Sequence, residues 1–178
     1  MMTAMEFVHS ELTRIHAIFD QALDGLTPDQ MHAVPGGTTK ANTIAWEVWH
    51  CVRTEDNIVR FVLQNRRSPV WVEGGYAEKL GLPPVAQGTG MSTEEAQALR
   101  IKDVPLFREY MQKVWASTEE LFATHDAAFF DTPVTIKGMG ELKAIVALGF
   151  ICVSHAMTHV GEIELSRTLL GAKTIGSH

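Results

Sequence analysis

Apolar residues recur at helical spacing along four long segments of the sequence, and no long stretch alternates apolar and polar residues as a strand would. We therefore expect an all-α fold, a four-helix bundle that forms a single domain over residues 1–178. A chain of this length can bury a sizeable core without disulfide cross-links. The expected helices run from about Met5 to Leu23, Thr43 to Asn65, Ser92 to Leu121 and Glu141 to Leu170.

The connections between these helices differ greatly in length. Residues 66–91 are rich in Gly and Pro and form a long crossover loop between the second and third helices, the kind of loop that usually covers a site. A capping box at Ser92–Glu95 opens the third helix. Pro105 inside its pattern predicts a kink or a restart near Asp103. The connector to the fourth helix includes a short extended piece at Val134–Ile136.

The composition excludes several classes of protein. The net charge is −6 at pH 7, whereas a nucleic-acid-binding domain normally carries a clear basic patch. The weakly polar run Ala144–Ala156 is too short to span a bilayer, and the N-terminus does not have the pattern of a signal peptide. The two cysteines, Cys51 and Cys152, do not form a disulfide scaffold. We expect a cytoplasmic protein with reduced thiols and with no nucleic-acid or membrane partner.

Two of the eight histidines stand out by their spacing. His155 and His159 are four residues apart on one expected helix, so their imidazoles project from the same face, one turn apart. With about 100° of rotation per residue, they share a sector with Leu148 and Cys152 that should face the bundle interior. Two inward imidazoles need partners in a dry place, and this spacing lets one helix supply two ligands to a metal. For most other histidines a solvated or hydrogen-bonded side chain is the simpler interpretation.

A metal site of this kind needs a third ligand, and the residues leave two choices. His50, in the middle of the second expected helix, lies off the apolar face, at a rim or cavity position that suits substrate access. Cys152 lies one turn before His155, but a buried cysteine is more often part of a core. Four roles stay open for Glu162, which lies three residues after His159: a metal ligand, a hydrogen-bond acceptor behind a ligand, a general base and a surface carboxylate.

Two familiar metal chemistries are disfavoured. The HExxH motif of zinc proteases has a glutamate after its first histidine to act as the base, and Ala156 occupies that position here. A di-iron bundle needs two Glu-x-x-His pairs and two further glutamates. Glu6–His9 supplies one such pair on the long expected helices, and we do not expect a di-iron site.

Three stretches of sequence together form a recognisable ordered pattern. They are Asn42–His50 followed by Arg53–Asp56, Trp71–Tyr76 leading to Gly81–Pro84, and His155–Ile163 running to Gly171. In this order they span nearly the whole chain, and the sequence resembles the DinB-like superfamily of metal-binding four-helix bundles. That superfamily includes the YfiT-type proteins and the thiol-dependent S-transferases and isomerases of bacteria.

The resemblance implies a ligand set and a cofactor. In such proteins one histidine from the second helix and two from the fourth bind a divalent metal, often zinc or nickel. The matching positions here are His50, His155 and His159. Many relatives have Gln where this chain has Glu162. Members of the family often form dimers. We expect the aromatic residues of the second helix to be exposed, which agrees with a homodimer.

Three neutral imidazoles leave coordination positions open, which is the arrangement of a catalytic rather than a closed structural site. With the resemblance, this predicts a metal-dependent transferase that uses a low-molecular-weight thiol on a small electrophile. Two alternatives stay open. One is metal-dependent hydrolysis of a small substrate, in which Glu162 would act as the base, and the other is a non-catalytic metal-binding stress-response protein.

Overall fold

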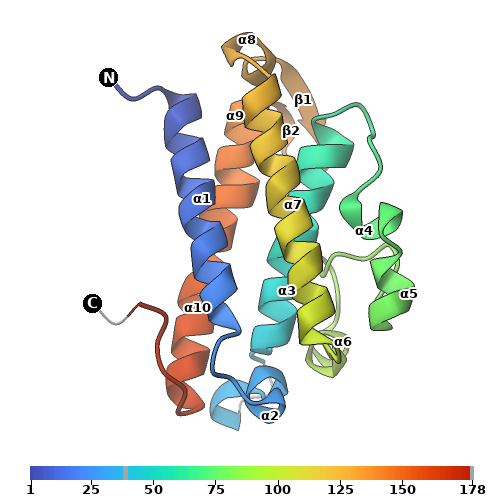
Figure 1. Cartoon of the computed structure of the whole chain (residues 1–178), viewed down its shortest axis with the longest axis vertical. Coiled ribbons are helices and arrows are strands. Elements are labelled where there is room, and N and C mark those ends of the chain that lie inside the picture. Colours follow the sequence, from blue (N-terminus) through green and yellow to red (C-terminus); the bar gives the residue numbers. More distant parts are fainter. Residues whose placement is uncertain (38–39, 177–178) are drawn as a thin grey trace.

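The structure, a computed structural model that describes residues 1–37 and 40–176, is a bundle of four long helical stretches (Figure 1). Helical segments follow one another without a break in the second and fourth stretches. The all-α prediction is therefore confirmed. The four stretches are α1 (Ala4–Ala22), then α3 (Ile44–Asp56) continued by η2 (Asn57–Val62), then α7 (Val104–Thr124), and finally α9 (Ala144–Ala147), η3 (Leu148–Ser154) and α10 (His155–Leu169).

Short elements fill the connections between the long helices. The long crossover carries two of them, α4 and α5, along the outer side of α3 and α7 (Figure 1). A β-hairpin connects α8 to α9 at one end of the bundle. The short elements are α2 (Pro28–His32), η1 (Pro35–Gly37), α4 (Val70–Glu73), α5 (Tyr76–Leu80), α6 (Thr93–Ala98), α8 (Ala127–Phe130), β1 (Pro133–Ile136) and β2 (Gly140–Lys143).

Polar side chains cap several of the helices. The hydroxyl groups of Thr3 and Thr43 accept backbone N–H bonds at the starts of α1 and α3, which satisfies donors that have no partner within the helix. The predicted restart at Pro105 is confirmed, because α6 ends at Ala98 and the Asp103 side chain caps a new helix, α7.

Two predicted helix boundaries were wrong. The fourth helix begins at Ala144 rather than Glu141, because residues 140–143 pair as β2 with β1 in an antiparallel hairpin. The extended piece Val134–Ile136 was predicted, but its partner strand was not. The second helix ends at Val62 rather than Asn65, because Asn65 adopts a φ of +50°, which a right-handed helix does not allow.

Two of the long helices contain a turn of π-helix. In η2 the backbone N–H of Leu63 donates to the carbonyl oxygen of Ile58 at 3.0 Å, five residues back. In η3 the N–H of His155 donates to Phe150, again five residues back. The two π-helical turns pack against each other. Such turns are rare and occur often at functional sites, and here one directly follows α3 while the other directly precedes α10.

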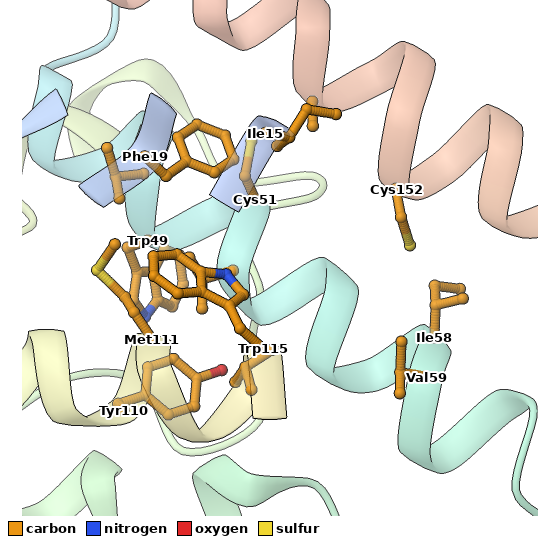
Figure 2. Close-up of a cluster of buried hydrophobic side chains, with 14 of the residues drawn as sticks. Ile15, Phe19, Trp49, Cys51, Ile58, Val59, Tyr110, Met111, Trp115 and Cys152 are labelled. Carbon is orange, nitrogen blue, oxygen red and sulfur yellow. The ribbon is translucent and has the colours of Figure 1, made fainter. Parts of the chain in front are cut away.

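Aromatic and aliphatic side chains from all four stretches fill the interior. Figure 2 shows Phe19 from α1, Trp49 from α3 and Trp115 from α7 in one buried cluster. Trp46 and Trp49 are both buried, so the expectation of exposed aromatic residues on the second helix was wrong for these two side chains, and only Phe61 on η2 is exposed there.

A hydrogen-bonded cluster of polar side chains is embedded in this core. His16 on α1 contacts the buried carboxylate of Glu55 on α3, with 2.8 Å between Nε2 and Oε1. Thr118 on α7 donates its hydroxyl to the same oxygen at 2.5 Å. These bonds satisfy the polar atoms and join three helices, so His16 has the hydrogen-bonded role expected for an ordinary histidine.

Within the described part of the chain, one stretch, Ala144–Leu169, has the length and apolar composition of a membrane-crossing helix. Core helices of bundles pass the same test. In the structure this stretch packs against α1 and α3, and it carries His155 and His159.

Candidate metal centre

His50 lies on α3 with its ring clamped between the helix and the long crossover. Its side chain is buried and stacks on Trp46, with 4.7 Å between ring centroids. On the outer side of the ring, Nδ1 donates a hydrogen bond to the carbonyl oxygen of Gln87. A carbonyl oxygen can only accept, so the proton lies on Nδ1 and the lone pair of Nε2 points inward.

Gly88 makes this approach of the loop possible. Its φ of +102° is a conformation that side chains disfavour. A Cβ atom at this position would lie 2.6 Å from Nδ1 of His50 and 2.9 Å from the Trp46 ring. The expectation that the long crossover covers a site agrees with this contact, because its backbone lies directly on an imidazole.

The two histidines of α10 complete a cluster with His50. Nε2 of His155 lies 3.1 Å from Nε2 of His50 and 3.0 Å from Nε2 of His159. All three side chains therefore turn the same kind of atom to one point. The three rings come from two helices that are distant in sequence and packed together in the bundle.

Two carboxylates lie on the Nδ1 side of the His159 ring. Its Nδ1 contacts the carboxylate of Glu47, which is buried on α3, and lies 2.7 Å from Oε2 of Glu162, whose side chain is about half exposed. Burial lowers the pKa of His159, but the hydrogen bonds and charges of Glu47 and Glu162 together outweigh it, and the pKa is raised overall. A carboxylate in this position holds the ring orientation and makes Nε2 a better donor to a metal.

Sequence analysis missed Glu47. Its signal was present: it is an acidic residue between Trp46 and Val48, in a segment of otherwise apolar character, three residues before His50. Charged side chains are almost never fully buried unless they are paired. Burial raises the pKa of Glu47, and the hydrogen bond with His159 acts in the opposite direction.

The other two imidazoles are neutral at pH 7. Burial lowers the pKa of His50 to about 4 and also lowers the pKa of His155. Neutral imidazole is the form that binds a metal. The desolvated position of these rings therefore favours the ligand form over the protonated form.

A count of protons shows that the cluster suits a cation. With its proton on Nδ1, His50 directs the lone pair of Nε2 at Nε2 of His155, and the neutral form of His159 does the same. Nε2 of His155 can carry one proton at most, and that proton can point to one neighbour only. The lone pair of the other neighbour would then lie about 3 Å from Nε2 of His155 without a hydrogen bond between the two atoms. A metal ion at the centre satisfies all three.

The distances agree with this interpretation. Ligands about 2.0–2.1 Å from a common metal, at ordinary coordination angles, lie roughly 2.8–3.4 Å from one another. The two Nε2–Nε2 distances of 3.0 and 3.1 Å fall in this range. The three histidines, with ligand atoms within 4.8 Å of one another, thus form a group that could hold a divalent metal ion.

Glu162 and Cys152, the other residues that the sequence singled out, lie outside this triad. Glu162 is an acceptor on the outer side of His159, one of the roles left open for it. Cys152 is buried in the core, and burial raises the pKa of its thiol well above the usual value. That environment favours the interpretation of Cys152 as a core residue.

A cavity of about 520 Å³ opens beside the triad. His50 and His155 form part of its wall, so the centre faces open space on this side. The rest of the wall comes from α3, η2, the crossover, the hairpin and η3. Its lining residues are His50, Thr54, Asn57, Ile58, Phe61, Val62, Gln87, Thr89, Thr135, Ile136, Lys137, Met139, Ile151 and His155.

Comparisons with known proteins agree with the fold. A family model described as the DinB superfamily matches residues 11–163. A crystal structure of a conserved protein from Enterococcus faecalis has the same fold, with a TM-score of 0.80 and 20% sequence identity over 97% of this chain and 100% of that chain. At this identity the likeness shows the fold alone. A search of curated proteins found no match.

Proposed function

The chain belongs to the DinB superfamily, and from that premise we propose that it is a metal-dependent transferase that joins a low-molecular-weight thiol to a small electrophile. The observation that carries this proposal is the convergence of three Nε2 atoms on one point at the wall of a cavity. A divalent ion held there, zinc or nickel, would supply a Lewis acid that lowers the pKa of a thiol.

The residues around the triad support this chemistry by fixing and desolvating the ligands. The Gln87 carbonyl orients His50, and Glu47 orients His159. The crossover at Gly88 closes one side of the His50 ring and keeps water from it. Substrate therefore approaches through the cavity, along the side formed by η2 and the hairpin.

The attacking thiol comes from outside the chain in this proposal. Both cysteines of the sequence, Cys51 and Cys152, are buried, and burial raises the pKa of each thiol well above its usual value. Because the thiolate is the nucleophile, neither side chain suits that role. A small thiol would instead enter the cavity. This supports a cytoplasmic setting, where thiols are kept reduced.

Hydrolysis is the less favoured alternative. A hydrolase in which Glu162 acts as the base needs that carboxylate near the reacting water, yet the described residues that line the cavity include no Asp or Glu. Glu162, the base considered from the sequence, contacts the outer nitrogen of His159. We therefore assign Glu162 to positioning His159 in this proposal.

The experiment is a thiol-consumption assay with protein loaded with zinc or nickel, L-cysteine as the thiol and 1-chloro-2,4-dinitrobenzene as the electrophile. The sulfur–carbon bond forms as the carbon–chlorine bond breaks, and the thioether is followed by absorbance. We expect metal-dependent turnover that His155→Ala abolishes. Dinitrophenol formation without thiol would indicate hydrolysis. Tight metal retention without any reaction would favour the non-catalytic metal-binding protein.

A further inference from the structure

The cavity beside the triad has a charge pattern that differs from the rest of the chain. The sequence carries a net charge of −6, but among the described residues that line this cavity the only Asp, Glu, Lys or Arg side chain is that of Lys137. We propose that the cavity binds an amphipathic anion: a small molecule with an apolar middle, a carboxylate that pairs with Lys137 and a polar end at the triad. This inference names the substrate class of the proposed function and rests on it.

Lys137 is placed to receive an anion. It lies in the turn that joins β1 to β2, between Ile136 and Gly138, and its side chain is exposed. Among the described residues it has no carboxylate partner, whereas Lys143 at the base of the same hairpin pairs with Asp131 at 2.9 Å. An ammonium group without a partner at the mouth of an apolar cavity is a site for a carboxylate.

The apolar part of the wall includes two exposed hydrophobic side chains. Phe61 on η2 is 43% exposed and Met139 in the hairpin turn is 48% exposed, and both line the cavity. Ile58 and Ile151 line it from the two π-helical turns. Burial of such surface by the apolar part of a ligand stabilises the complex.

A polar group inside the cavity lacks a partner. Thr54, one turn after His50 on α3, is 5% exposed, and its hydroxyl makes no hydrogen bond with the described residues. A buried hydroxyl without a partner is unfavourable. Because Thr54 lines the cavity next to His50, a ligand atom at the triad end can accept its hydrogen bond. The wall is therefore polar near the triad, apolar along η2 and cationic at the hairpin.

The test uses protein loaded with cobalt and three thiols that differ at one end. They are 6-mercaptohexanoate, 6-mercaptohexan-1-ol and 6-aminohexane-1-thiol, and binding is followed by the thiolate-to-cobalt absorption band. We expect the carboxylate to bind at least about tenfold more tightly than the alcohol or the amine. Lys137→Gln should reduce that preference to within about twofold, whereas the control Lys102→Gln should leave it unchanged.

Thr54→Val separates the two ends of the ligand, since it removes the hydroxyl and keeps the shape. It should weaken all three thiols by a similar factor, about threefold to tenfold, and leave the preference for the carboxylate intact. Equal affinities of the three thiols for the wild type, or a preference that survives Lys137→Gln, would overturn the inference while the thiol band still supported the proposed function.

A second arm needs no metal. Saturation-transfer NMR with hexanoate and hexan-1-ol on protein stripped with EDTA should show a stronger signal from hexanoate, and Lys137→Gln should remove the difference. Absence of the cobalt–thiolate band with every thiol would refute the proposed function. The hexanoate comparison would then decide this inference alone, with equal signals for the two ligands counting against it.

Discussion

At the scale of single residues, two imidazoles of the triad are oriented by a group that contacts their outer nitrogen, Nδ1. His50 has a backbone carbonyl, and His159 has the buried carboxylate of Glu47. Spacing alone identified His155 and His159, because ligands four residues apart lie on one helix face. Glu47 could not be assigned in the same way, because its role depends on how α3 and α10 pack, which spacing within one helix does not reveal.

Replacing Glu47 tests the role of the carboxylate behind His159. We expect Glu47→Gln to weaken zinc binding by about 10–100-fold, because a neutral amide holds the Nδ1–H of His159 less strongly. Glu162→Gln is the matched control: its side chain is about half exposed and Glu47 remains in place, so the loss should be about threefold or less. Competition with a chromophoric chelator measures both affinities. Equal losses in the two variants would contradict the assignment of Glu47.

The lowered pKa of His50 makes a second prediction, for metal-free protein. The folded state disfavours the proton, with a pKa of about 4, whereas the unfolded chain binds it near the usual value of about 6.5. The unfolded state therefore binds more protons in this interval, and acidification destabilises the fold as the pH falls from about 6.5 to 4.

Because Glu47 and Asp56 also have shifted pKa values, this effect is measured as a difference between two proteins. In urea titrations with EDTA present, the stability of the wild type relative to His50→Gln should fall by about 2 kcal/mol between pH 7.5 and 4.5. A difference that stays constant over this range would show that His50 titrates normally in the folded protein.

At the scale of elements, periodicity and caps predicted the helices. The details that shape the site arise where the backbone departs locally from a regular α-helix. The helical projection assumed an unbroken α-helix through Leu148 and His155. In fact η3 intervenes, and a π-helical turn takes more residues than an α-helical turn. The phase therefore shifts before the histidines. His155 and His159 are half-buried rather than fully inside, and His155 lines the cavity.

The hairpin shows a different limit of the sequence pattern. A short strand is stabilised by its partner, so Val134–Ile136 could be recognised as extended while Gly140–Lys143 resembled the start of a helix. Their pairing brings the turn with Lys137 to the cavity. That placement depends on tertiary packing, and the sequence pattern alone does not contain it.

Gly88 links the crossover to the site, and its replacement tests that link. Gly88→Ala should lower the stability by about 1–2 kcal/mol through its positive φ and should also weaken zinc binding, because the new Cβ would displace the loop from His50. Gly90→Ala is the control: its φ is +81°, but a Cβ there meets nothing within 4 Å.

Thermal melts and zinc titrations of the two variants separate the effect of backbone strain at a positive φ from the effect of the contact between the crossover and His50. Both variants should melt at lower temperature than the wild type, and only Gly88→Ala should lose zinc affinity. Unchanged zinc binding in Gly88→Ala would show that the crossover does not support His50.

At the scale of the whole molecule, an apolar face between α1 and the fourth stretch is left uncovered. Phe7 on α1 and Phe150 on η3 are 52% and 54% exposed, and both line a shallow hollow with Val146. Contiguous exposed apolar surface marks interaction sites. With Trp46 and Trp49 buried, this face is the better candidate for the expected homodimer.

Light scattering tests the dimer. We expect the wild type to have the mass of two chains at micromolar concentration, and Phe150→Glu to give a monomer, because an unpaired charge at the contact opposes association. Val85→Glu, at a position that is 85% exposed on the crossover, should stay dimeric. A wild-type mass of one chain would show that the protein is a monomer and would contradict this prediction.

The central claim is that His50, His155 and His159 hold one divalent ion. The most direct test is elemental analysis of purified protein that has been equilibrated with zinc or nickel at pH 8 and desalted. We predict about one ion per chain for the wild type, and almost none for His155→Ala with its helical circular dichroism retained, since Ala favours helix. A wild type without bound metal, or a His155→Ala variant that retains as much metal as the wild type, would contradict the claim.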